Sequence, residues 1–84
     1  MELKVGVITH YYSKIGVAIV EITDEPLSVG DTIHIKGHTT DFQQSVTSMQ
    51  IEHQQIQTAK KGEVIGLKVE QKCHEKDIVY KVIP

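Results

Sequence analysis

The chain has 84 residues with 9 lysines, no arginine, 11 acidic residues, five histidines and one cysteine, and its formal net charge is -2 at neutral pH. This length permits one small domain and excludes anything larger. Isoleucine and valine supply 21 residues and threonine 7, against 5 for leucine and alanine together, which favours β-sheet and excludes a helical bundle.

No targeting or membrane segment is evident in the sequence. No apolar run approaches the ~18 residues of a membrane span, and the first residues contain no signal-peptide core. A single cysteine cannot form an internal disulfide, which suits a reducing compartment. We therefore expect a soluble cytoplasmic protein.

Residues 3–9 alternate apolar and polar side chains, as half-buried strands do, whereas residues 15–23 are apolar on both faces, with Glu21 marking the outer one. Strands are expected over residues 3–9 and 15–23, and a third strand around Ile35 follows a polar connection over residues 24–31. His34 falls on the outer face of this third strand. The side chains expected to point inward are Leu3, Val5, Val7, Ala18, Val20, Ile22, Ile33 and Ile35.

The second half adds three further strands. Between residues 42 and 57 the apolar positions change parity after Val46 and before Met49, which predicts a long strand with a bulge near residues 47 and 48. A polar loop is expected over residues 71–77. The inward-pointing side chains of the last two strands are expected to be Ile65, Leu67, Val69, Ile78, Tyr80 and Val82. Six short strands predict an all-β fold, a small closed antiparallel Greek-key barrel, with residues 1–84 as a single domain.

Catalytic chemistry finds little support in the sequence. The chain has no phosphate-binding loop and no dinucleotide fingerprint, so we expect neither GTP binding nor a cofactor. Cys73 and His74 are adjacent, like a nucleophile and its base, but neighbours in extended chain point to opposite sides, and a loop does not fix their geometry. We expect an exposed thiol in a polar loop and no catalytic residue.

The histidines do not follow a metal-binding pattern. His34 and His38 are four residues apart across Gly37, and in extended chain their Cα atoms would lie ~13 Å apart, too far for a shared tetrahedral metal. His10 and His53 could converge only through the tertiary fold. We therefore expect five mostly exposed histidines and no metal site.

The sequence supports nucleic-acid binding only in part. Arginine, which binds phosphate in a bidentate manner, is absent, and the net charge is negative. Lysines at one turn and on outer strand faces could form a local basic patch, or could be an ordinary solvated face. Two tyrosines after the first strand could form a rim for a base or a protein partner, or could cap the barrel end. The candidate binding residues are Tyr11, Tyr12, Lys36, Lys60, Lys61 and Lys68.

Three segments in a fixed order carry a family resemblance. They are LSVGDTIHIKG over residues 27–37, VTSMQI over residues 46–51 and AKKGEVIGLKV over residues 59–69. Together they resemble the second domain of translational GTPases such as elongation factor Tu, a β-barrel, over about residues 4–82. The GTPase domain and the third domain of those factors have no counterpart in this sequence. The chain is also similar to the barrel at the C-terminus of the U32 collagenase-like peptidase family, which includes tRNA-modifying members.

The resemblance implies a non-enzymatic binding module that engages RNA, tRNA or the ribosome. The alternative is an accessory domain that docks by protein contacts on an enzyme such as a U32-type peptidase or a tRNA-modifying protein. The missing arginine and the negative charge favour this alternative. Neither a membrane nor a nucleotide is expected as a partner.

Overall fold

Strands and turns make up the whole chain in the computed structural model, which describes all 84 residues. The predicted all-β fold is confirmed. No helix is present that is long and apolar enough to cross a membrane. The strands are β1 (Glu2–Tyr12), β2 (Val17–Ile22), β3 (Leu27–Ser28), β4 (Thr32–Lys36), β5 (Asp41–Ser45), β6 (Met49–Ile51), β7 (Gln54–Ile56), β8 (Thr58–Ala59), β9 (Val64–Lys68) and β10 (Ile78–Val82).

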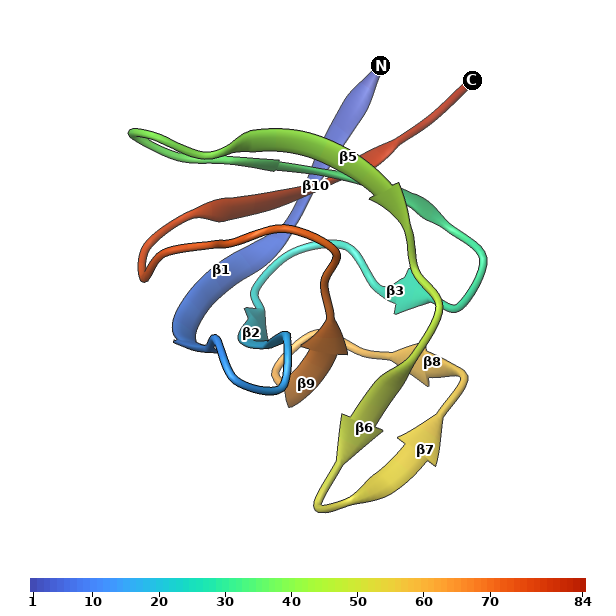
Figure 1. Cartoon of the computed structure of the whole chain (residues 1–84). Helices are drawn as coiled ribbons and strands as arrows, with labels where there is room; N and C mark the ends of the chain where they lie inside the picture. The colour runs from blue at the N-terminus through green and yellow to red at the C-terminus, as the bar shows by residue number, and fades with distance from the viewer.

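Eight of the ten strands form one curved antiparallel sheet in the order β5-β4-β10-β1-β2-β9-β6-β7, and β3 pairs with β8 in a second sheet. Strands β5 and β7 are the edges of the large sheet and do not pair with each other, so a closed six-stranded barrel is not supported. Figure 1 shows the sheet curling around itself, with β3 and β8 beside the segment where β5 leads into β6.

The segment over residues 42–57 contains three strands where one long strand was predicted. The parity change is confirmed, because Val46 and Met49 are both buried. It occurs where residues 46–48 leave the sheet, and not at a bulge within a continuous strand. Backbone bonds hold this break in place: Gly30 N donates to Val46 O at 2.9 Å, and Val46 N donates to Asp31 O at 2.8 Å. These bonds continue the β4–β5 pairing beyond Thr32 and Ser45, before the chain leads into β6.

Seventeen buried side chains form one hydrophobic core inside the curved sheet. The predicted inner faces of β2, β4 and β9 are confirmed, because these strands alternate strictly and none of them contains an extra residue that would change its facing. Their buried side chains are Ala18, Val20, Ile22, Ile33, Ile35, Ile65 and Leu67.

The predicted facing of the first and last strands is wrong in part. Val5 and Ile8 are fully buried in β1, whereas Val7 is only half-buried. The register of β1 shifts between Lys4 and Gly6 against β10, and again between Ile8 and His10 against β2. Each irregularity moves the following side chains to the other face.

In β10 the buried residue is Val79, and the three side chains predicted to point inward are half-buried. Val79 pairs directly with Ile35 of β4, and directly paired residues share a face of the sheet. Tyr80 therefore lies on the outer side, where the Lys36 ammonium is 6.0 Å from its ring centroid.

A tight hairpin joins β6 to β7. Ile51 pairs with Gln54, so only Glu52 and His53 form the turn, with φ angles of 50° and 66°. Positive φ at both positions is the backbone of a type I′ turn, which usually selects Asn-Gly. The hairpin was not predicted because Glu-His does not have this composition.

Residues 69–77 fold inward over one end of the core, which corrects the prediction of an exposed thiol. Cys73 is 1% exposed and belongs to the hydrophobic core. Asp77 is also buried, and its Oδ2 accepts a hydrogen bond from His74 N at 2.8 Å. Burial, and the nearby negative charge of Asp77, raise the pKa of the Cys73 thiol to about 11.

A buried amide links edge strand β5 to the end of β9 and to the chain that follows it. Gln44 Nε2 donates to Lys68 O at 2.9 Å, and Gln44 Oε1 accepts from Glu70 N at 2.7 Å. The side chain thus makes the two hydrogen bonds that a neighbouring strand would make, at the open edge of the sheet.

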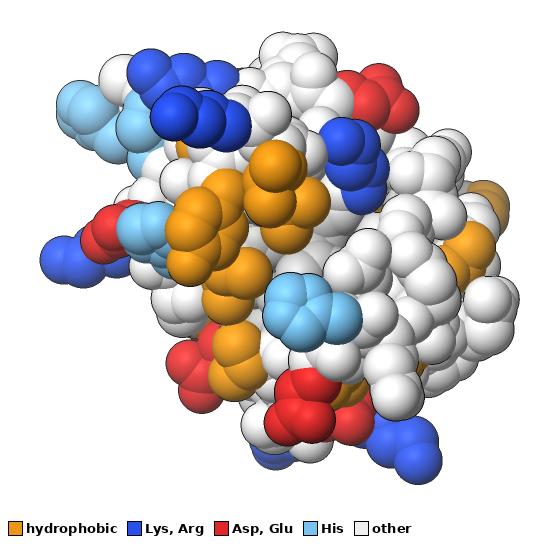
Figure 2. Space-filling model, turned by 60° about the horizontal axis from the view of Figure 1, so that its bottom comes forward, with side chains coloured by type: hydrophobic (Ala, Val, Ile, Leu, Met, Phe, Trp, Pro, Cys, Tyr) orange, Lys and Arg blue, Asp and Glu red, His pale blue; other side chains and the backbone are white.

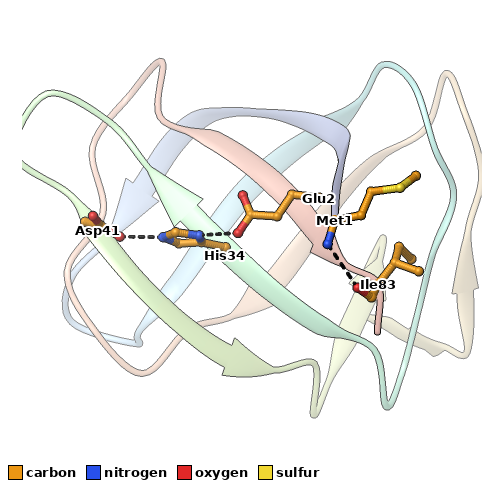
Figure 3. A network of polar contacts seen from close by, with 5 residues as sticks. All are labelled: Met1, Glu2, His34, Asp41 and Ile83. Carbon is orange, nitrogen blue, oxygen red and sulfur yellow. Dashed lines mark hydrogen bonds and ion pairs between the residues drawn. The ribbon is translucent and has the colours of Figure 1, made fainter.

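Both chain ends lie at one end of the molecule, and the β6–β7 turn lies at the other (Figure 1). The Met1 ammonium donates to Ile83 O at 3.2 Å (Figure 3). The face around the β6–β7 turn is therefore remote from both termini.

Candidate docking surface

The β1–β2 hairpin presents apolar side chains to solvent. Tyr12 ends β1, and its carbonyl accepts hydrogen bonds from Ile15 N at 3.3 Å and from Gly16 N at 3.0 Å. Gly16 has φ of 65°, which glycine adopts without steric cost and which returns the chain into β2. This turn leaves Tyr12 49% exposed and Ile15 59% exposed.

Beside this hairpin, the outer face of the sheet contains a gap in its side chains. Ile19 of β2 pairs with Gly66 of β9, and Gly66 pairs on its other side with Gln50 of β6. Paired residues across neighbouring strands lie in one row on the same face. Because Gly66 has no side chain, the row is hollow at its centre.

A groove of about 300 Å³ opens over this position. Figure 2 shows a patch of hydrophobic side chains on this side of the molecule, with histidines beside it, lysines at its upper end and acidic side chains at its lower end. Val64, which is 54% exposed, is two residues from Gly66 on the same face of β9. The groove is lined by Tyr12, Ile15, Val17, Ile19, Gln50, Glu52, His53 and Gly66.

Polar groups surround the groove without filling it. Lys68 Nζ donates to Ile15 O at 2.9 Å, which ties the tip of the β1–β2 hairpin to the end of β9. The ring of His10 lies edge-on to Tyr12 with centroids 4.4 Å apart, and His10 Nδ1 is 3.6 Å from the Glu75 carboxylate. These contacts hold Tyr12 and Ile15 in position at the groove.

The residues predicted as binding candidates do not gather in one place. Tyr12 lines the groove, whereas Tyr11 is half-buried and packs against the core. Lys60 and Lys61 are exposed in the turn before β9, and Lys68 lies at the far end of that strand. Lys36 lies on β4, which three strands separate from β9 in the sheet. These lysines are therefore spread over β4, the turn before β9 and the far end of β9.

His34 is on the outer face as predicted, but it is not exposed. Only 14% of its side chain is accessible, and Nδ1 lies 2.7 Å from Glu2 Oε2 while Nε2 contacts Asp41 (Figure 3). The hydrogen bonds to Asp41 and then to Glu2 raise the pKa of His34, and the same contact lowers the pKa of Asp41.

The histidines considered as metal ligands do not come together in the structure. His38 is exposed and takes no part in the contacts of His34. His53 lines the groove, and His10 pairs with Glu75. No group of three histidine, cysteine or acidic side chains is arranged so that it could hold a metal ion.

The chain is similar in sequence to parts of a protease and of a collagenase. No protein-family model matches the chain. The chain is 40% identical over 80 residues, 94% of its length, to an uncharacterized protease of Methanocaldococcus jannaschii. It is 36% identical over 81 residues, 95% of its length, to a collagenase of Porphyromonas gingivalis.

Solved structures decide the fold. The C-terminal domain of a putative U32 peptidase from Geobacillus thermoleovorans matches with a TM-score of 0.87 at 18% identity, covering 98% of this chain and 93% of that one. The selenomethionine variant of the same domain matches with a TM-score of 0.84, covering 90% and 95%. The chain has the fold of a U32 peptidase C-terminal domain.

This similarity concerns a small part of much longer proteins. The chain spans 19% of the Methanocaldococcus relative and 20% of the Porphyromonas relative. Of the two resemblances read in the sequence, the one to the U32 C-terminal domain is supported. The one to the second domain of elongation factor Tu receives no support from these comparisons.

Most of the groove escaped prediction from the sequence. Ile15, Val17 and Ile19 belong to a segment that is apolar on both faces, and such a segment resembles a fully buried strand. Gly66 and His53 carry no local pattern that marks a binding site. The one signal in the sequence is that this segment is apolar on both faces. A strand whose outer face is also apolar is either buried on both sides or contributes to an exposed apolar patch, and such patches mark interaction sites.

Proposed function

We propose that the chain is a non-enzymatic accessory domain that docks on a U32-type peptidase or a tRNA-modifying protein through the groove at Gly66. The carrying observation is that three of the four large hydrophobic side chains exposed on the chain, Tyr12, Ile15 and Val64, lie on this one face. Clustered exposed apolar groups rimmed by polar ones are typical of protein interaction sites. The match to one fifth of the curated relatives is consistent with a module that serves a larger protein.

The environments of Cys73 and His34 support a non-enzymatic role. The Cys73 thiol is buried with a raised pKa, so thiolate is scarce at neutral pH. His34, the histidine best oriented by carboxylates, has both ring nitrogens occupied by Glu2 and Asp41. A general base needs a free nitrogen directed at the proton that it removes.

Charge favours a protein over RNA as the partner. A protein that binds RNA through phosphate needs several cationic side chains along one surface. Here Lys36, Lys60 and Lys68 are distributed over separate parts of the sheet, and arginine is absent. The groove itself contains an acidic side chain, Glu52, and no lysine.

The test uses the Methanocaldococcus relative from which the segment matching this chain has been deleted. Calorimetry should detect saturable binding of the wild-type chain to this truncated protein. Tyr12→Ser should weaken the affinity about tenfold or more, since buried tyrosines dominate interface energies. Gln43→Ser, an exposed change on β5, is the matched control and should leave affinity unchanged. No binding, or equal binding by both variants, would contradict the proposal, as would saturable binding of tRNA to the chain with a steep dependence on salt.

A further inference from the structure

The groove has no side chain at its base, where Gly66 lies, and its lining contains one acidic residue, Glu52. Both features restrict which ligand can bind there. We propose that it receives one bulky apolar side chain from a peptide segment of the protein partner, and that lysine or arginine flanks that side chain. This inference rests on the proposed function and adds the chemistry of the partner.

The floor and walls define the apolar part of the site. A β-carbon built on Gly66 would lie 3.4 Å from Val17 Cγ1, 4.0 Å from Ile19 Cδ1 and 3.9 Å from Gln50 O. These are ordinary van der Waals distances, so carbon atoms fit against this floor while contacting both walls. The volume of about 300 Å³ is at the low end of the ~300–1,000 Å³ of small-molecule sites, which suits a single large side chain.

The charge of the groove determines which residues of the bound peptide are favoured beside its apolar side chain. Glu52 is the one formally charged side chain that lines the groove at neutral pH. Glu21, on the outer face of β2, is exposed and pairs with Val64, and it adds negative charge on the same face. Lys68 keeps its positive charge, but it lies at the other end of β9 from Val64, where its ammonium donates to Ile15 O. A cation beside the apolar side chain is therefore attracted at the end of the groove near Glu52 and Glu21, and an anion is repelled there.

The same features argue against two other occupants. A nucleic acid would bring phosphates toward Glu52 and find no lysine in the groove. A second copy of the chain, related by a two-fold axis through the groove, would bring the two Glu52 carboxylates together. A basic, apolar peptide segment meets neither obstacle.

Three capped pentapeptides serve as probes, with the central sequences Lys-Phe-Lys, Glu-Phe-Glu and Lys-Ser-Lys between glycines. Binding is measured from the amide NMR shift of Gly66 in the full chain. The basic phenylalanine peptide should bind best, the acidic one about two- to fivefold more weakly, in line with an exposed charge pair. The serine peptide should produce no saturable shift, because it lacks the apolar side chain.

Charge reversal separates the groove from general electrostatics. In Glu52→Lys the preference between the two phenylalanine peptides should invert, whereas Glu25→Lys, an exposed change in the connection after β2, should leave it intact. Equal binding of the basic and acidic peptides, an inversion produced by Glu25→Lys, or dimerisation of the chain through the groove in sedimentation would overturn the inference. If the truncated relative still binds in a Tyr12-dependent manner, only the partner chemistry fails and the proposed function stands.

Discussion

At the scale of single residues, His34 shows how a side chain expected to be a solvated strand residue becomes a link between strands. Its imidazole connects Glu2 at the start of β1 with Asp41 at the start of β5. Both contacts favour the charged ring, so the pKa of His34 lies above its ordinary value of 6.5. A folded-state pKa above the unfolded value contributes stability below the unfolded pKa, and this contribution disappears as pH rises through the folded pKa.

We therefore expect His34→Ala to destabilise the protein more at mildly acidic pH than in alkaline solution. The low pKa of Asp41 keeps that carboxylate ionised across the acidic part of this range, so the pair remains intact there. Urea unfolding at several pH values measures the difference from the wild type. His38→Ala, which removes an exposed histidine that takes no part in these contacts, is the matched control and should destabilise the protein less than His34→Ala at mildly acidic pH. A pH-independent effect of His34→Ala would refute the account of this contact.

Cys73 gives a second prediction at this scale. At pH 8, raising the thiol pKa from 9.0 to about 11 reduces the thiolate fraction by about 100-fold. Reaction of the folded protein with a disulfide reagent should be slower than that of the urea-unfolded chain by about this factor or more. A folded protein whose thiol reacts as fast as the unfolded chain would show that residues 69–77 do not cover the core.

At the scale of elements, the buried face of a strand could be predicted from the sequence where the strand alternates regularly. It could not be predicted where a strand contains a register shift. The inner faces of β2, β4 and β9 follow from alternation, because none of these strands contains an extra residue of its own. The faces of β1 and β10 do not, because two register shifts interrupt β1. Such shifts depend on partner strands far away in the chain. The break between Val46 and Met49 was visible as a parity change, but parity alone does not distinguish a bulge from the end of a strand.

The Gln44 side chain gives the prediction that belongs to this scale. It is buried, and its amide satisfies Lys68 O and Glu70 N at the open edge of the sheet. Gln44→Ala leaves these groups without a partner and should cost about 2 kcal/mol in urea unfolding. The amide of Glu70 should also lose protection from hydrogen exchange.

Gln43→Ala is the matched control for this change. Gln43 is the exposed neighbour on β5, and its truncation should cost within about 0.5 kcal/mol. Equal costs for the two alanine variants would mean that the amide contacts do not hold the edge of the sheet.

At the scale of the whole molecule, the exposed apolar side chains gather at one end of the curved sheet. Figures 1 and 2 together place the apolar patch on the end remote from both termini. The all-β class and the likeness to the U32 C-terminal domain could be recognised from the sequence. The groove could not, because it needs Tyr12, Ile19 and Gly66 to meet across three strands. The lysines were visible in the sequence, but their separation over different strands was not.

The most direct test of docking through the groove is the amide NMR spectrum of the chain, free and saturated with the truncated Methanocaldococcus relative. The docking account predicts that shifts and line broadening concentrate at Tyr12, Ile15 and Gly66, whose side chains or backbone line the groove. Signals of Lys36 and Lys61 should remain in place. Changes centred on those lysines, with Gly66 unaffected, would contradict it.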